Sequence, residues 1–352
     1  MIPSHPSLNL KAPLQGRYIR PEHIEQWISV SSLDWKVMGR SEENRAIYAL
    51  KWGRGSTKVM MWSQMHGNES TTTRALADII QNLESAGSNH PWFEQFSFLL
   101  LPQLNPDGAE RFTRVNANQV DLNRDAIEQS QKESRVLRTC FEEFQPNYCF
   151  NLHDQRSIFG AGTSGEPAQV SFLAPAADLD KSKTPSRTVS AHLIVAMRNA
   201  LYPVIGNRVG RYDDHFNGNC VGDYFQSKGV PTILFEAGHA GLDYQREECR
   251  SLIAYSLVHC LDHIHQLSPD SDWPATYEII PENEKNFMDG VIVDGSERMG
   301  FQYREEVLND QLHFIPEKVA PDYTAPFVHR ELHTNRPEDQ RAIQEVLAQL
   351  KK

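Results

Sequence analysis

The sequence predicts an α/β protein with a largely parallel sheet that is covered by helices on both faces. Segments with the composition of strands alternate with segments of helical periodicity up to about residue 267. One of these strands, residues 96–101 (FSFLLL), is apolar throughout, which is typical of strands buried on both faces. Short alternating segments follow from about residue 273. They predict a small β-rich C-terminal appendage (273–352) after a larger main domain (1–272).

The elements are expected in a regular order along the chain. Residues 1–34 are irregular apart from one short helix at 21–28. Strands are then predicted at residues 35–39, 45–52, 58–62, 96–101, 148–152, 170–174 and 232–235. Helices are predicted around residues 75–83 and at 129–144, 186–201, 246–267 and 337–350.

Composition excludes several classes of function. The chain has 352 residues and a formal net charge of −11, and nucleic-acid binding needs a basic face, so no nucleic-acid partner is expected. No apolar run approaches the roughly 20 residues of a membrane span, and the first residues lack the pattern of a signal peptide. We therefore expect no membrane association and a cytoplasmic location. The five cysteines are scattered without a C-x-x-C motif and are expected to be reduced.

The stretch His66-Gly67-Asn68-Glu69 lies on the predicted turn between a strand and a helix. Such turns at the carboxyl ends of strands are where ligands bind in open α/β sheets. A histidine and a carboxylate three residues apart can bind one zinc ion, since zinc accepts both types of ligand. Alternatively, Glu69 begins the helix and His66 is a surface turn residue.

Three more polar sites occur at or after the ends of predicted strands. His153 follows the strand at 148–152, and Glu236 follows the strand at 232–235. Asn123 and Arg124 lie in the loop after residues 96–101. Each of them alone also fits a structural role, such as a hydrogen-bonded strand end or a solvated loop. The carboxyl ends of parallel strands share one edge of a sheet, so we expect the sites to converge with the turn at residues 66–69.

Convergence of these residues would supply the parts of metal-assisted hydrolysis. His66, Glu69 and His153 are predicted to bind one zinc ion and leave a place for water. Glu236 is predicted to be the general base that takes the proton from that water. Arginines would bind an anionic end of the substrate or the developing oxyanion.

A rival metal site lies near the end of the helix predicted at 246–267. His259 and His263 are one helical turn apart, with His265 close by, and this spacing can bind zinc. No glutamate follows His259, so the H-E-x-x-H pattern is absent. Histidines near a helix C-terminus also complement the helix dipole, and we prefer that interpretation.

The motifs together resemble the zinc metallocarboxypeptidase family of the carboxypeptidase A and B type. The resemblance runs from about Val37 to Gly238 and rests on ordered motifs, namely the opening hairpin at 38–50, His66-Gly67-Asn68-Glu69, Asn105-Pro106-Asp107-Gly108, the segment 114–124, Leu152-His153 and Phe235-Glu236. It implies a three-layer α/β/α sandwich around a mixed, mostly parallel sheet, with one zinc ion as cofactor.

The resemblance also implies roles for individual residues. Arg114 would polarise the scissile carbonyl, and Asn123 and Arg124 would bind the terminal carboxylate of the substrate. Tyr212 is the nearest candidate for the mobile tyrosine of the family, although Asp214 and His215 crowd the same region.

The sequence departs from the family in places that bear on specificity. Asp125-Ala126 replaces the usual Asn-Phe, and Val221–Asp223, where side-chain preference is set, indicates neither a basic nor a large apolar preference. We expect the substrate to be a peptide or an N-acyl amino acid with a free carboxylate. A deacylase of the aspartoacylase and succinylglutamate desuccinylase type, a cell-wall peptide amidase and an inactive binding module stay open as alternatives.

Overall fold

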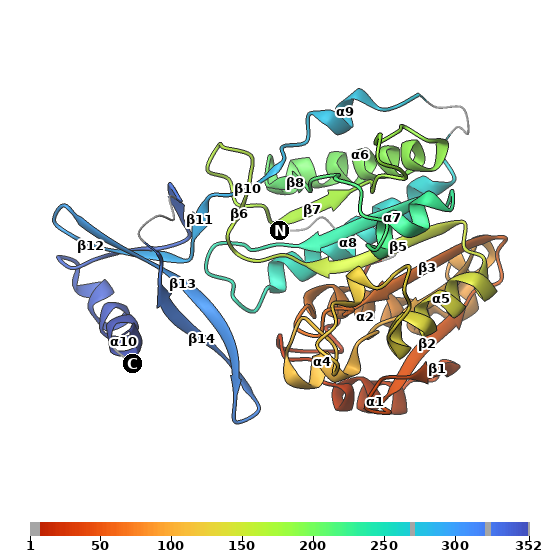
Figure 1. Ribbon diagram of the computed structural model, residues 1–352, viewed down its shortest axis with the longest axis horizontal. Coiled ribbons are helices and arrows are strands. Elements are labelled where there is room, and N and C mark those ends of the chain that lie inside the picture. Colours follow the sequence, from red (N-terminus) through yellow and green to blue (C-terminus); the bar gives the residue numbers. More distant parts are fainter. Residues whose placement is uncertain (1–7, 268–271, 321–324, 351–352) are drawn as a thin grey trace.

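The computed structural model describes residues 8–267, 272–320 and 325–350. Figure 1 shows a larger part, in which helices pack on a central sheet, and a smaller β-rich part that carries the C-terminal helix α10 (Gln340–Leu350). The short helix predicted near the start is α1 (Pro21–Ser29). The predicted change from alternating helices and strands to short β segments falls at residues 268–272, most of which lie outside the described residues. Within the described ranges, no helix combines the length and the apolar character needed to cross a membrane.

The central sheet has eight strands in the order β1-β2-β4-β3-β5-β9-β7-β8. The pairs β3–β4, β3–β5, β5–β9 and β7–β8 are parallel, and β1–β2, β2–β4 and β7–β9 are antiparallel. The sheet is therefore mixed and mostly parallel, as predicted. Its strands are β1 (Trp35–Arg40), β2 (Ala46–Trp52), β3 (Thr57–Ser63), β4 (Phe96–Leu101), β5 (Tyr148–Asp154), β7 (Val170–Leu173), β8 (Val209–Arg211) and β9 (Thr232–Ala237).

Helices cover both faces of this sheet because its central strands are apolar on both sides. Along β3, Val59 and Met61 enter one hydrophobic core, and the alternating Met60 and Trp62 enter the other. The first core is shared with α2 (Thr71–Ala86), α6 (Pro185–Ile205) and α8 (Glu247–Ile264), and the second with α5 (Lys132–Phe144) and α7 (Val221–Ser227). The three-layer α/β/α sandwich is thus confirmed.

Two element boundaries follow from local sequence features. Helix α6 continues past residue 201 and through Pro203, and it ends where Gly206 takes a positive φ of 60°. Pro203 has no N–H and so removes one hydrogen bond from the last turn of this helix. The motif Asn105–Gly108 begins the short helix α4 (Pro106–Arg111), with the Asn105 side chain accepting a hydrogen bond from the Gly108 N–H at 2.8 Å.

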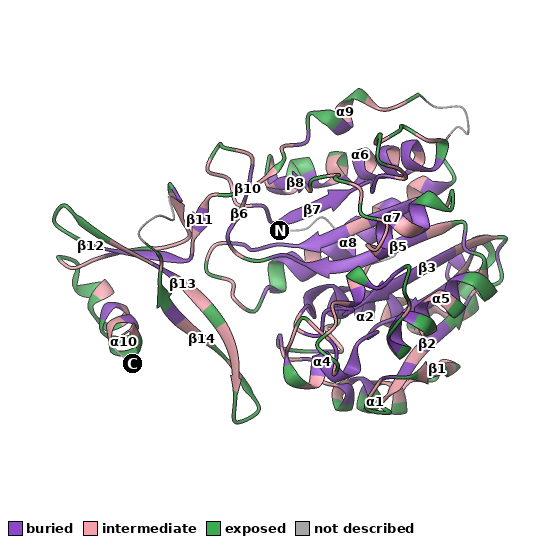
Figure 2. Cartoon of the chain, in the orientation of Figure 1, coloured by how far each residue is buried: buried purple, intermediate pink, exposed green. Residues whose placement is uncertain are grey.

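The smaller part is β-rich, as predicted, and ends in the expected helix. Its sheet has the order β14-β13-β12-β16, and a separate pair joins β11 and β15. Figure 2 shows that the long β13–β14 hairpin is mostly half-buried or exposed, unlike the buried strands of the central sheet. The strands are β11 (Phe287–Met288), β12 (Gly290–Asp294), β13 (Glu297–Leu308), β14 (Gln311–Lys318), β15 (Phe327–Val328) and β16 (Glu331–His333).

The segment between the two parts packs on the larger one. Helix α9 (Ala275–Glu278) contributes Tyr277 to the core beneath α6, and strand β10 (Asn283–Lys285) pairs with β6 (Phe159–Ala161). The division into domains at residues 272 and 273 stays a prediction. The remaining short helix is α3 (Trp92–Gln95).

Candidate active site

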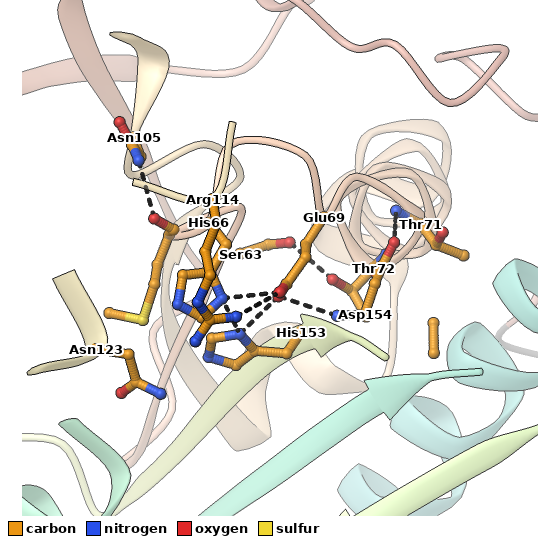
Figure 3. Close-up of polar contacts among 12 residues, drawn as sticks. Ser63, His66, Glu69, Thr71, Thr72, Asn105, Arg114, Asn123, His153 and Asp154 are labelled. Carbon is orange, nitrogen blue, oxygen red and sulfur yellow. Dashed lines mark hydrogen bonds and ion pairs between the residues drawn. The ribbon is translucent and has the colours of Figure 1, made fainter. Parts of the chain in front are cut away.

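Three predicted metal ligands meet at the carboxyl ends of strands β3 and β5. His66 and Glu69 lie on the turn between β3 and α2, which a hydrogen bond from the Glu69 N–H to the His66 carbonyl closes at 3.0 Å. His153 is the next-to-last residue of β5. Figure 3 shows the three side chains pointing toward one another. His66 Nδ1 and His153 Nδ1 are each 2.8 Å from a carboxylate oxygen of Glu69 and 3.1 Å from each other.

A hydrogen bond on its far nitrogen orients the His66 ring toward the common centre. His66 Nε2 lies 3.0 Å from Asp121 Oδ1. Burial opposes ionisation of Asp121, but the hydrogen bond from His66 and the charges of His66 and Arg114 lower its pKa far below the ordinary value. Ionised Asp121 only accepts, so His66 Nε2 carries a proton, and Nδ1 is the ring nitrogen that lies toward the centre.

The donor set fits zinc. Two imidazole nitrogens and one carboxylate are a ligand set that zinc accepts in catalytic sites, where water takes the fourth position. Their ligand atoms are close enough together to bind one ion, and His66 and His153 are almost completely buried. Asp121 accepts a hydrogen bond from the far ring nitrogen of His66, as a carboxylate often does beside a metal-binding histidine.

Asp154 fixes the turn that carries Glu69. Its carboxylate accepts hydrogen bonds from the first backbone N–H groups of α2, at Thr71 (2.8 Å) and Thr72 (3.1 Å). Its own N–H donates to Glu69 Oε2 at 3.2 Å. Asp154 therefore caps the helix that follows the ligand turn, although it lies on a different strand.

Glu236 lies directly beside His153, since the register of the parallel pair β5–β9 sets these residues opposite each other. It is 9% exposed, and no described residue forms a hydrogen bond with its buried Oε2. Burial and the negative charges of Glu69 and Asp154 raise the pKa of Glu236 well above its ordinary value. The site thus holds a carboxyl group that takes up a proton readily.

The predicted substrate-binding residues lie around this centre. Arg114 donates to Asp121 Oδ2 at 3.0 Å and to Glu69 Oε1 at 3.3 Å. Exposed Arg124 donates to the carbonyl of Asn123 at 2.7 Å and lies 3.0 Å from Cys220 Sγ.

Tyr212 follows the short strand β8, and its ring contacts Phe159. Burial and the charges of Glu236 and Glu69 raise the pKa of its hydroxyl well above the ordinary value, against a hydrogen bond with the Asn283 side chain. The hydroxyl is thus neutral and faces the acidic centre.

All eight predicted site residues line one cavity of about 650 Å³, a size suited to a small ligand. They are His66, Glu69, Arg114, Asn123, Arg124, His153, Tyr212 and Glu236. Their roles stay predictions, but the predicted convergence is observed.

The rival histidines do not form a comparable cluster. His263 lies in the last turn of α8, as the helix-dipole interpretation expects. The two groups of potential metal ligands found among the described residues do not include His259, His263 or His265.

Three further residues belong to the site although no individual role was predicted for them; one of these, Asp223, lies in the segment 221–223, where side-chain preference was expected to be set. Asp121 lies within the family motif at residues 114–124, and its contact with His66 depends on how that loop folds. Asp223 lines the cavity, and burial raises its pKa to about 6. Asn283 reaches Tyr212 from the segment after residue 272, and no local sequence pattern reveals this contact.

Comparisons with known proteins point to the zinc carboxypeptidases. The model of the family described as zinc carboxypeptidase matches residues 31–160. "Probable carboxypeptidase 2" of Trichophyton verrucosum is 28% identical over 178 residues, which are 46% of this chain and 32% of that protein. "Carboxypeptidase 2" of Trichophyton tonsurans is 29% identical over 184 residues, 48% of this chain and 32% of that protein. The chain thus spans about a third of the length of these curated relatives.

Solved structures share the fold. Carboxypeptidase A from Helicoverpa armigera aligns with a TM-score of 0.55 and 17% identity over 72% of this chain and 75% of that one. A metallo-carboxypeptidase from Pseudomonas aeruginosa, in complex with (2-guanidinoethylmercapto)succinic acid, aligns with a TM-score of 0.52 and 16% identity over 69% of both chains. The resemblance to the zinc metallocarboxypeptidases is confirmed. So is the predicted zinc ion as the cofactor of the family, for which His66, Glu69 and His153 form a suitable group.

Proposed function

Because this chain contains a region of the zinc carboxypeptidase family, we propose that the protein is a zinc-dependent hydrolase that cleaves a peptide or amide bond next to a free carboxylate of its substrate. The observation that carries the proposal is the gathering of all eight predicted residues around one cavity of about 650 Å³. The cavity includes possible metal ligands, arginines, and the carboxyl group of Glu236, whose Oε2 has no hydrogen-bond partner among the described residues. Such a reaction needs these groups.

His66, Glu69 and His153 would hold the zinc ion. When bound, zinc lowers the pKa of water toward about 7 and polarises a carbonyl group. Asp121 would keep the His66 ring in the orientation that presents Nδ1, through the 3.0 Å contact with Nε2.

Glu236 would act as general base and then as general acid. It would accept the proton of the attacking water and deliver it to the leaving nitrogen as the bond to the carbonyl carbon breaks. The raised pKa of Glu236 supports this role. A carboxylate whose pKa lies closer to neutral pH accepts a proton from the water more readily and can still release it to the leaving nitrogen. Its unpartnered Oε2 leaves an oxygen available to the water.

The cations would orient the substrate. Arg124 and Asn123 would bind the terminal carboxylate, and the exposed guanidinium of Arg124 suits a planar carboxylate. Arg114 would stabilise negative charge on the scissile carbonyl oxygen, since its guanidinium lies near Glu69 beside the ligand group. Tyr212 would close the cavity over the bound substrate and donate a hydrogen bond from its neutral hydroxyl.

The cavity favours a substrate whose C-terminal residue has a cationic side chain. Asp223 is 6% exposed and lines the cavity together with Asp213. The Pseudomonas aeruginosa neighbour was solved with a ligand whose name specifies a guanidino group and a succinic acid. A carboxylate that lines the cavity would pair with such a guanidinium.

A comparison of substrates tests the proposal. N-acylated dipeptides ending in arginine or phenylalanine would each be offered with a free and with an amidated C-terminus, beside simple N-acyl amino acids and cell-wall peptides. We expect zinc-dependent cleavage of the free dipeptides, with arginine preferred, and a loss of at least about tenfold in kcat/KM on amidation, as for a lost charge-assisted contact. Equal cleavage of free and amidated dipeptides would contradict the carboxylate-binding role. Cleavage of N-acyl amino acids alone would favour the deacylase alternative.

A further inference from the structure

A second cluster of possible metal ligands joins the larger part of the molecule to the smaller one. His239 comes shortly after strand β9, Asp289 lies between β11 and β12, and His329 follows β15. One potential ligand atom from each of these residues lies within 4.8 Å of the other two. The active-site cavity is lined by a different set of residues.

The hydrogen bonds of the two histidines place the proton on the same ring nitrogen, Nε2, in both. His239 Nε2 lies 2.7 Å from the carbonyl of Gly241, and His329 Nε2 lies 2.8 Å from the carbonyl of Ser157. A carbonyl oxygen can only accept, so each Nε2 carries the proton and each Nδ1 keeps a lone pair. A ring N–H bonded to a backbone carbonyl is the usual arrangement of metal-binding histidines.

His239 Nδ1 is a buried acceptor that nothing in the described chain satisfies. The residue is 2% exposed, and no hydrogen-bond partner of Nδ1 occurs in the ranges that the structure describes. Its ring packs edge-on against the ring of His329, with the centroids 4.6 Å apart. A buried polar atom without a partner is costly unless something binds it.

Asp289 adds a buried carboxylate to these nitrogens. It is 1% exposed and accepts hydrogen bonds from the Tyr244 hydroxyl at 2.9 Å and the Tyr303 N–H at 2.7 Å, together with the Gln302 amide. These donors are uncharged, so they hold the carboxylate in place without neutralising it. Oδ2 accepts the hydrogen bonds from Tyr303 and Gln302, whereas Oδ1 accepts the one from Tyr244 and keeps a lone pair that can bind a cation.

Three potential ligand atoms therefore lie close together, two of them on the buried His239 and Asp289 and one on the half-buried His329. A cation between them would satisfy the two Nδ1 atoms and offset the charge of Asp289.

We propose that His239, Asp289 and His329 bind a second zinc ion, separate from the ion at the active site. Two imidazole nitrogens and one carboxylate form a ligand set typical of zinc, whereas calcium and magnesium prefer oxygen ligands alone. The ion would fasten the loop after β9, the strand that carries Glu236, to the β11–β15 pair of the smaller part. The site thus stabilises the junction of the two parts.

The test counts zinc in the full-length protein after equilibration with excess zinc and removal of unbound metal. The wild type should carry two equivalents, and the double variant His66→Ala/His153→Ala should keep one. Adding His239→Ala to the double variant should remove the remaining equivalent. Adding His313→Ala should leave it in place, because His313 is an exposed histidine of β14 and serves as the matched control. Circular dichroism would verify the fold of each variant.

Two results would overturn the proposal, and neither depends on catalysis. The first is a folded double variant that retains no zinc. The second is a double variant that retains one equivalent of zinc and still retains it after His239→Ala is added. If the triple variant does not fold, thermal unfolding of the double variant decides, since zinc bound only by the native state must raise its Tm. A zinc-independent Tm there would equally refute the second site, whatever the substrate experiments show.

Discussion

The variant Glu236→Gln is expected to lose activity without losing stability. Glutamine keeps the shape of glutamate but cannot take up a proton, so kcat should fall by the ~10²–10⁴-fold that a positioned general base contributes. That range corresponds to ~3–5 kcal/mol of transition-state stabilisation. Zinc content should stay at the wild-type level, because Glu236 is placed beside the ligand group and not within it.

The stability of this variant follows from the surroundings of the carboxylate. Glu236 is buried next to Glu69 and Asp154, and its pKa is raised above the value in the unfolded chain. A raised carboxyl pKa means that the native state binds more protons than the unfolded state, so ionisation at pH 7 destabilises the fold. Removing that charge should leave the free energy of unfolding of the metal-free protein unchanged or higher.

Glu305 provides the matched control with the opposite sign. It lies on β13 and forms an ion pair with Arg17, and despite burial the charges of Arg17 and Arg246 lower its pKa. Glu305→Gln should therefore lose ~1.5–3 kcal/mol, the range for hydrogen bonds to charged groups. Because the native pKa is lowered, the contribution of this pair is present above the unfolded pKa and is lost as the pH falls through the native pKa.

Urea unfolding of the metal-free variants, steady-state kinetics and metal analysis measure these quantities. Wild-type kcat in Glu236→Gln would show that the proton goes to another group, with Asp154 the next candidate. Loss of zinc together with activity would make Glu236 a ligand. A destabilisation of Glu236→Gln equal to that of Glu305→Gln would refute the electrostatic reasoning.

Three further outcomes are expected. Asp121→Asn should weaken zinc binding ~10–100-fold in a competition titration with a chelator, as for other second-shell carboxylates, and unchanged affinity would argue against this role. The ratio of kcat/KM for arginine-ending over phenylalanine-ending dipeptides should rise about fivefold between pH 5 and pH 7 as Asp223 ionises near pH 6, and Asp223→Asn should abolish the rise. Gly67→Ala should destabilise the protein by ~1–3 kcal/mol in urea unfolding, because a Cβ there would lie 1.9 Å from the Gly108 carbonyl carbon; wild-type stability would mean that the two backbones separate easily.

The parts of the site that local sequence patterns encode were predictable. His66 and Glu69 are three residues apart on one turn, and His153 and Glu236 directly mark the ends of apolar strands. The parallel order of β3, β5 and β9 then brings them together. These positions needed only the periodicity of the chain and the rule that parallel strands share an edge.

Contacts between distant segments were not predictable in the same way. Asn283 reaches Tyr212 because the short strand β10 pairs with β6, and three-residue strands leave little pattern in a sequence. His239 and His329 are 90 positions apart and meet only after the smaller part has packed on the larger one. Their chemistry depends on tertiary packing, which periodicity does not report.

The pairing of β10 with β6 also bears on attempts to shorten this chain. Strand β8 is the last strand of the central sheet, and its Arg211 N–H donates to the carbonyl of Pro281 at 2.8 Å. The stretch 281–285 therefore satisfies backbone groups on two strands, β6 and β8, that would otherwise be open to other chains. Open strand edges are templates for intermolecular pairing. A fragment that stops at residue 272 would expose both edges and should self-associate, whereas one that extends beyond residue 285 keeps them covered.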